Sequence, residues 1–156
     1  MSGMTRHLTR GLVAGAVGTT ALNAATYLDM VLRGRPSSST PEQSVERAAH
    51  LLGITVPGDE DRRRARVSGL APLLGTAVGV GAGLALGGLR GAGWPRGRVT
   101  TLMVAWVLAM TAGNGPMAAL GVTDPRAWSA TDWLADIAPH AAYAVAATAT
   151  LEAFGH

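Results

Sequence analysis

An uncharged, glycine-rich stretch from Gly69 to Leu89 limits what this chain can fold into. Its sequence is GLAPLLGTAVGVGAGLALGGL, and about 20 apolar residues in a helix cross the hydrocarbon core of a bilayer. Four of its glycines recur at every fourth position and share one side of a helix: Gly75, Gly79, Gly83 and Gly87. In water each glycine weakens a helix by about 1 kcal/mol relative to alanine. In lipid the backbone has no water to bond, so the helix persists.

Three further apolar stretches give the chain its predicted architecture. Apolar residues make up 48% of the sequence and the mean hydropathy is +0.24, a composition that favours a membrane protein. We expect membrane helices over residues 8–32, 69–89, 99–120 and 132–154. A hydrophilic loop, 33–68, follows the first helix and contains a short amphipathic helix from Pro41 to Leu52, with Thr40 as its N-cap. The sequence thus predicts one all-α domain, 1–156, an integral membrane four-helix bundle.

Glycines also line the first apolar stretch. Gly11 and Gly15 are separated by three residues, a spacing that lets two membrane helices approach closely and gain dispersion contacts. We therefore expect the first helix to pack its glycine face against the glycine face of the 69–89 helix.

The charged residues set limits on location and partners. The chain has no cysteine, and all 13 of its basic residues are arginine, which indicates a GC-rich bacterial coding bias and a bacterial cytoplasmic (inner) membrane protein. The arginines lie at the edges of apolar stretches, where they anchor to headgroups, so we expect the lipid bilayer and no nucleic acid as partner. Four helices place both termini on one side. Arginine density in the short N-terminal tail and second loop favours cytoplasmic termini, whereas a strict count of arginines puts the first loop inside.

The predicted fourth helix carries the residues that are the strongest candidates for chemistry. Asp136, His140 and Tyr143 fall at i, i+4 and i+7 and share one face. Ionisable groups in lipid are costly and normally face the bundle interior. Structural hydrogen bonding is the favoured interpretation; a proton or ion relay through the imidazole, ligation of a metal or cofactor, and contact with a ligand are the alternatives. A metal site is short of ligands because His7, His50 and His156 lie outside the apolar stretches, so we expect no metal and no cofactor.

Three polar residues on other helices are candidates to face this group. Asn23 and Tyr27 lie four residues apart on the first helix, and Asn114 opens the Asn-Gly-Pro interruption of the third. A polar seam that fixes helix packing is the favoured interpretation. A small hydrated cavity with a bound ligand is the alternative, because a proline frees a backbone carbonyl at membrane depth.

Several short motifs resemble one known family. Gly11-Leu-Val-Ala-Gly15, Pro116 followed by Leu120-Gly-Val-Thr-Asp-Pro125, and Asp136-Ile-x-x-His140 are together similar to the YagU-like uncharacterised inner-membrane proteins. The resemblance implies a four-helix membrane fold, with Asp136 and His140 in place of the family's carboxylate and histidine. The family carries a lysine and an acidic residue where this chain has Leu22 and Thr26, and the resemblance implies no activity.

No catalytic motif is present, so the sequence favours a non-enzymatic membrane protein in a structural or partner-subunit role. The alternative is a small proton- or ion-coupled transporter or channel subunit that uses the Asp136 and His140 pair. Glycine grooves on four helices also favour association, either as a homo-oligomer or with another membrane protein.

Overall fold

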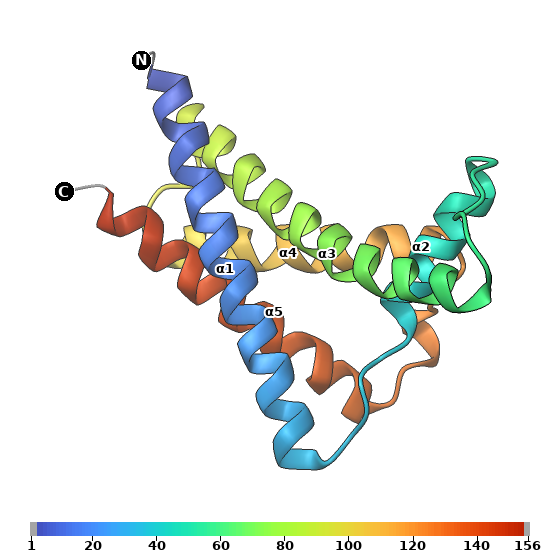
Figure 1. The fold of residues 1–156 in the computed structure, drawn as a ribbon. Coiled ribbons are helices and arrows are strands. Elements are labelled where there is room, and N and C mark those ends of the chain that lie inside the picture. Colours follow the sequence, from blue (N-terminus) through green and yellow to red (C-terminus); the bar gives the residue numbers. More distant parts are fainter. Residues whose placement is uncertain (1–2, 155–156) are drawn as a thin grey trace.

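The computed structural model describes residues 3–154, and these residues form helices joined by short connections (Figure 1). The α-helices are α1 (Gly3–Arg33), α2 (Thr40–Leu51), α3 (Glu60–Gly91), α4 (Arg98–Ala119) and α5 (Ala130–Ala153), and a 3-10 turn, η1 (Pro125–Ala127), precedes α5. No strand occurs between residues 3 and 154. The prediction of an all-α fold is therefore confirmed.

Helix α3 is longer than the apolar stretch that predicted it. It begins at Glu60, nine residues before Gly69, because the Asp59 side chain caps it by accepting a hydrogen bond of 2.9 Å from the backbone N–H of Arg62. The predicted hydrophilic loop over 33–68 thus holds α2 and the first two turns of α3. Helix α2 begins at Thr40 with Ser39 as its N-cap, not Thr40 as predicted, and α4 runs past Pro116 to Ala119.

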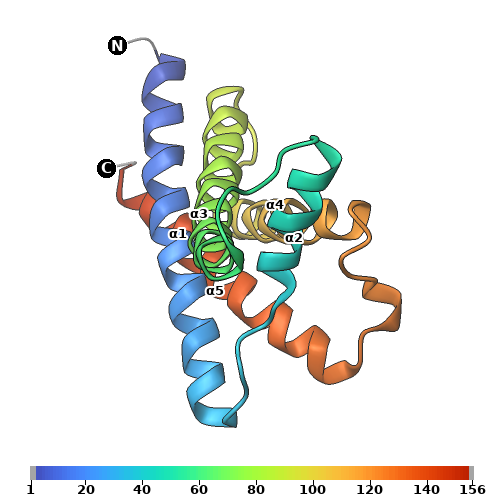
Figure 2. The same cartoon turned by 45° about the vertical axis from the view of Figure 1, so that its right-hand side comes forward.

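Each of the four long helices packs against two of the others. Helix α1 lies against α3 and α5, α4 lies against α3 and α5, and α2 rests on α3 alone among these pairs. In Figure 1 α1 and α3 run close together near the N-terminus, and the second half of α1 then diverges from α3. In Figure 2 the second half of α1 continues below α3. The molecule is therefore closed at one end and splayed at the other.

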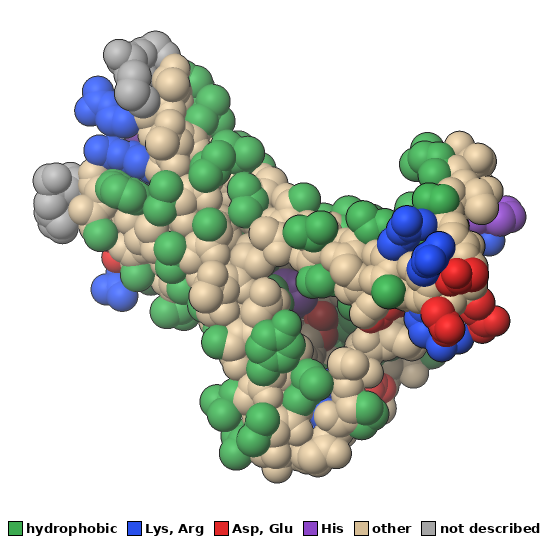
Figure 3. Space-filling model, in the orientation of Figure 1, with side chains coloured by type: hydrophobic (Ala, Val, Ile, Leu, Met, Phe, Trp, Pro, Cys, Tyr) green, Lys and Arg blue, Asp and Glu red, His purple; other side chains and the backbone are tan. Residues whose placement is uncertain are grey.

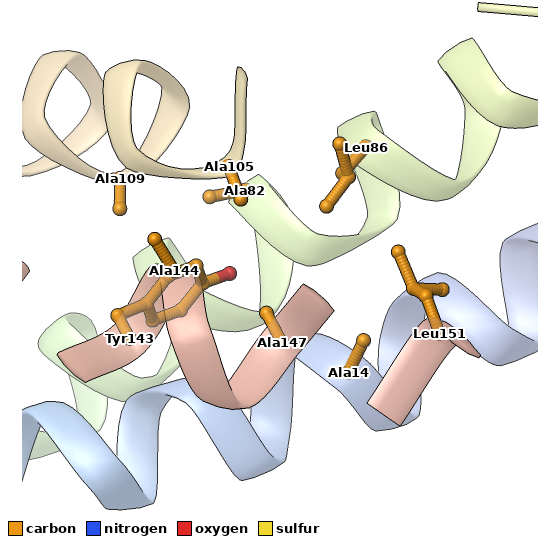
Figure 4. Close-up of a cluster of buried hydrophobic side chains, with 9 residues drawn as sticks. All are labelled: Ala14, Ala82, Leu86, Ala105, Ala109, Tyr143, Ala144, Ala147 and Leu151. Carbon is orange, nitrogen blue, oxygen red and sulfur yellow. The ribbon is translucent and has the colours of Figure 1, made fainter. Parts of the chain in front are cut away.

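The core is built mainly from alanine. Figure 4 shows α4 facing α5, with α3 and α1 completing the cluster. Its buried members are Ala14, Ala82, Leu86, Ala105, Ala109, Tyr143, Ala144, Ala147 and Leu151. Small side chains let the four helix backbones come close without large residues between them.

Glycines form the contact between α1 and α3. A Cβ added at Gly11 would lie 2.5 Å from the carbonyl oxygen of Gly83 and 2.8 Å from the Cα of Gly87, and one at Gly15 would lie 2.9 Å from the Cα of Val80. Real Cβ atoms do not come so near to backbone atoms, so only glycine allows this crossing. The two helices meet backbone to backbone.

The prediction for Gly75 is wrong. A Cβ at this position would have nothing within 4 Å, whereas one at Gly79, Gly83 or Gly87 would meet α1. The reason is the crossing of the two helices: α1 turns away from α3 before it reaches the turn that carries Gly75. The one-in-four pattern therefore extends one turn beyond the contact.

Two helices, α3 and α4, are long and apolar enough to cross a membrane. In their most apolar windows only 22% of the α3 residues and 11% of the α4 residues are buried. Helices α1 and α5 do not reach the same level of apolarity, and both carry polar residues within the predicted spans, Asn23 in α1 and Asp136 with His140 in α5.

A pair of glycine substitutions on α3 tests the crossing. A Cβ at Gly83 would lie 2.5 Å from the carbonyl oxygen of Gly11 and from the backbone nitrogen of Gly15, so Gly83→Ala must push the helices apart. We expect it to lower the free energy of unfolding by about 1–3 kcal/mol, the usual range for overpacking. Gly75→Ala, in open space on the same helix, is the control and should leave stability unchanged or raise it by up to about 1 kcal/mol. Unfolding by SDS titration in mild detergent measures both, and equal losses would contradict the crossing.

Candidate functional site

Helices α4 and α5 bring an amide and a carboxylate together. The Asn114 side chain donates a hydrogen bond of 2.7 Å from Nδ2 to Oδ2 of Asp136. Asn114 lies in the last two turns of α4 and Asp136 in the second turn of α5, so the bond ties the end of one helix to the start of the next. It joins two of the residues that the sequence marked as candidates.

His140 stands one turn further along α5 and contacts Asp136. Its Nδ1 lies 2.7 Å from the backbone carbonyl oxygen of Asp136 and 3.5 Å from the carboxylate Oδ1. A carbonyl oxygen only accepts, so Nδ1 carries the proton, and in the neutral imidazole Nε2 is the acceptor. The side chains of His140 and Asp136 are 12% and 18% exposed.

Gly113 makes room for the imidazole. A Cβ at this position would lie 3.2 Å from Nε2 of His140, so the bare backbone of α4 lets the ring edge approach. The sequence analysis missed this residue, and its position directly before Asn114 was the available signal.

Three buried polar atoms on α4 and α5 have no partner. Among residues 3–154, Oδ1 of Asn114, Nε1 of Trp106 and Oγ1 of Thr148 are buried without a hydrogen bond. Native proteins satisfy most buried polar groups, so an unfilled acceptor next to a carboxylate leaves this cluster short of hydrogen-bond donors.

A hollow opens beneath α3 on the face shown in Figure 3, between the second half of α1 and the N-terminal half of α3. Acidic and histidine atoms are visible inside it. In Figure 1, α5 runs behind this opening. The hollow is the splayed end of the bundle, where α1 has left α3.

Tyr143 belongs to the same face of α5 but serves a different contact. Its hydroxyl donates a 2.7 Å hydrogen bond to the backbone carbonyl oxygen of Gly79 on α3, and the residue is 1% exposed. A Cβ at Gly18 of α1 would lie 2.8 Å from its ring. Tyr143 therefore bonds α5 to α3 through its hydroxyl and packs its ring against α1 at Gly18. Its hydroxyl is not bonded to Asp136 or His140.

The two candidates on α1 are not bonded to the cluster. Tyr27 is 60% exposed and makes no side-chain hydrogen bond to a residue between 3 and 154, so its predicted place in the seam stays a prediction. Asn23 is half-buried and makes no side-chain hydrogen bond to a residue between 3 and 154. The spacing of the two residues identified a shared face, but not the divergence of α1 from its neighbours.

Thr19 is a contact residue that the sequence analysis did not select. It is buried, donates a 2.7 Å hydrogen bond to the carbonyl oxygen of Gly15, and occupies the space left by the missing side chain of Gly79. No group of three or more His, Cys, Asp or Glu side chains that would hold a metal occurs in the described part of the chain.

Comparisons with protein families, with curated proteins and with solved structures gave no match to this chain. The resemblance to the YagU-like proteins stays a prediction.

A double-mutant cycle measures the α4–α5 bond. We expect Asn114→Ala and Asp136→Ala each to lower the free energy of unfolding, and the pair to show a coupling energy of about 0.6 kcal/mol, with about 1.7 kcal/mol as the upper limit for such bonds in membranes. SDS titration of the four proteins gives the coupling. Tyr27→Phe is the control and should change stability by less than about 0.5 kcal/mol, because the side chain is exposed. Strictly additive losses would show that the bond does not form.

Proposed function

We propose that the chain is a multi-pass integral membrane protein whose helices α1, α3, α4 and α5 cross a bacterial cytoplasmic membrane. The distribution of charge carries this proposal. Every Arg, Asp and Glu except Asp136 lies near an end of a long helix, in α2 or in a connection. Residues 11–28, 67–89 and 99–119 contain none, and 133–151 contain Asp136 alone. Each stretch is close to the roughly 20 residues that span the hydrocarbon core.

The exposed apolar surface supports the same proposal. Side chains that face outward between the charged ends include large apolar ones such as Leu12, Leu73, Val99 and Val107. On the face shown in Figure 3 charged atoms gather at the extremities and apolar and backbone atoms fill the middle. Soluble monomers rarely expose apolar surface of this extent, whereas a lipid-facing surface is apolar by necessity.

Within the membrane we propose a non-enzymatic role, as a structural protein or as the subunit of a larger assembly. The polar groups of the core are mostly engaged in contacts between or within helices, as in Asn114 to Asp136 and Tyr143 to Gly79. These bonds hold helices in place. Association with a second copy or with another membrane protein fits the apolar outer face of α4, because helices in lipid associate through packing.

Single cysteines test the membrane proposal cleanly, because the chain has none of its own. Ala92→Cys and Ser37→Cys lie in connections at opposite ends of the bundle, and Met103→Cys lies on α4, where Met103 is 49% exposed. In intact cells a membrane-impermeant maleimide should label Ser37→Cys at once and Ala92→Cys only after the membrane is opened, since we propose cytoplasmic termini. Met103→Cys should stay unlabelled until detergent is added. Labelling of Met103→Cys as fast as Ser37→Cys in sealed membranes would refute the proposal.

The second candidate function is a small proton- or ion-coupled transporter or channel subunit. One observation favours it: Asp136 is the only carboxylate within residues 11–28, 67–89, 99–119 and 133–151, and it contacts a histidine. Such residues in membrane helices mark ion and proton pathways. Both side chains are partly exposed, Asp136 by 18% and His140 by 12%, so the pair is not sealed from its surroundings.

Flux into proteoliposomes separates the two functions. If the chain conducts, wild-type protein shows proton or cation flux. We expect His140→Ala, and Asp136→Asn, which keeps the shape of the side chain, each to lower that flux at least tenfold. Tyr27→Phe is the control and should keep full flux. All variants are first checked for unchanged helical CD and unfolding midpoint. Absence of flux in the wild type, with both cluster variants less stable, would leave the structural role.

A further inference from the structure

At one end of the bundle the four long helices are held together by specific contacts. We call this end the closed end. A Cβ at Gly91 of α3 would meet Met4 and His7 of α1, and Arg90 of α3 donates a 3.1 Å hydrogen bond to the hydroxyl of Thr101 on α4.

The remaining two contacts complete the ring. Arg98 of α4 lies 3.5 Å from Glu152 of α5. The Arg10 guanidinium of α1 stacks over the ring of Phe154, just beyond the end of α5, with 5.9 Å between its carbon and the ring centroid. The closed end is thus one continuous surface made by four helix ends.

This surface is strongly basic. Its charged residues are Arg6, Arg10, Arg90, Arg96, Arg98 and Glu152. Within residues 3–154, Arg98 is the only one of these arginines that forms an ion pair, and its partner is Glu152. Four guanidinium groups therefore have no carboxylate of the described residues within contact distance.

The splayed end carries more arginines but balances them. The run Arg62-Arg-Arg-Ala-Arg66 attracts attention in the sequence, yet Arg62 pairs with Asp59 at 3.5 Å, Arg63 with Glu46 at 2.8 Å and Arg64 with Glu60 at 2.8 Å. Near the end of α1, Asp29 pairs with both Arg33 and Arg35. This end holds eight carboxylates and eight arginines, so its formal charges cancel; among residues 3–154, Arg47, Arg66 and Arg126 are its arginines without an ion pair.

The protein orients the free guanidinium groups of the closed end. Arg90 donates one hydrogen bond to Thr101, and Arg96 donates one of 3.1 Å to the carbonyl oxygen of Gly93. The guanidinium of Arg10 lies over the ring of Phe154. A guanidinium has five N–H donors in a fixed fork, so most donors stay available. Their geometry suits the paired oxygens of a phosphate.

We propose that the closed end binds the phosphates of anionic phospholipids. The proposal rests on the membrane proposal above, which sets these arginines at the ends of apolar stretches, at headgroup depth. Trp94, 50% exposed between α3 and α4, is of the type enriched at that depth. A lipid is favoured over a soluble phosphate because the arginines are spread around the rim of an apolar bundle and do not converge on one pocket.

Thermal unfolding of the purified full chain in mild detergent tests this proposal. Short-chain phosphatidylglycerol should raise the unfolding midpoint by several degrees, and zwitterionic phosphatidylcholine and inorganic phosphate at matched phosphate concentration should not. High salt should reduce the shift, because it screens exposed charges.

Matched variants locate the binding. Arg6→Gln with Arg96→Gln should lose most of the phosphatidylglycerol shift, and Arg62→Gln with Arg64→Gln, at the splayed end, should keep it. Equal loss in both pairs, or an equal shift with phosphatidylcholine, would overturn the proposal; an equal shift with inorganic phosphate would show that the source is a soluble anion. Failure of the membrane proposal itself is recognised separately, by labelling of Met103→Cys in sealed membranes.

Discussion

The backbone contact between α1 and α3 determines the rest of the structure. Gly11 and Gly15 meet Gly83, Gly87 and their neighbours with no side chain between them, and this proximity is what lets α5 reach both helices. Tyr143 lies across Gly18 of α1 and donates to Gly79 of α3, a geometry that exists only where the two helices touch. The position of α5 then places Asp136 and His140 against the end of α4.

The composition of the core supports the proposed membrane location. Six of the nine residues in the main buried cluster are alanines, so little apolar area is removed from water, and burial at about 25 cal/mol per Å² contributes little. Large apolar side chains such as Leu32 and Val31 face outward instead. In a bilayer these side chains need no cover, and close packing of small residues supplies the attraction between helices.

Sequence patterns predicted features that depend on neighbouring turns of one helix and failed where the answer depended on how helices cross. The spacing of Gly11, Gly83 and their partners identified a packing face, but the limit of that face, between Gly79 and Gly75, is set by the angle at which α1 leaves α3. For the same reason Tyr27 is 60% exposed and not bonded to the polar cluster.

The pairing of charged residues depends on the helix arrangement in the same way. In the arginine run after Asp61, Arg62 and Arg64 pair with Asp59 and Glu60, which lie three and four residues away, whereas the pair of Arg63 with Glu46 of α2 depends on tertiary packing. The unpaired arginines of the closed end are scattered over the first 100 residues and become one surface only when α1, α3 and α4 are brought together. The bond from Asn114 to Asp136 joined two candidates that the sequence could name but not place in contact.

The central claim is that α3 is a lipid-embedded helix packed on α1 through glycine, and hydrogen–deuterium exchange in lipid nanodiscs tests it most directly. Although many of its side chains face outward, every backbone N–H within a membrane helix is hydrogen-bonded and shielded from water. The account predicts that amides of residues 75–89 remain protected for hours while those of the connection at 34–38 exchange within seconds. Exchange of residues 75–89 as fast as that connection would contradict it.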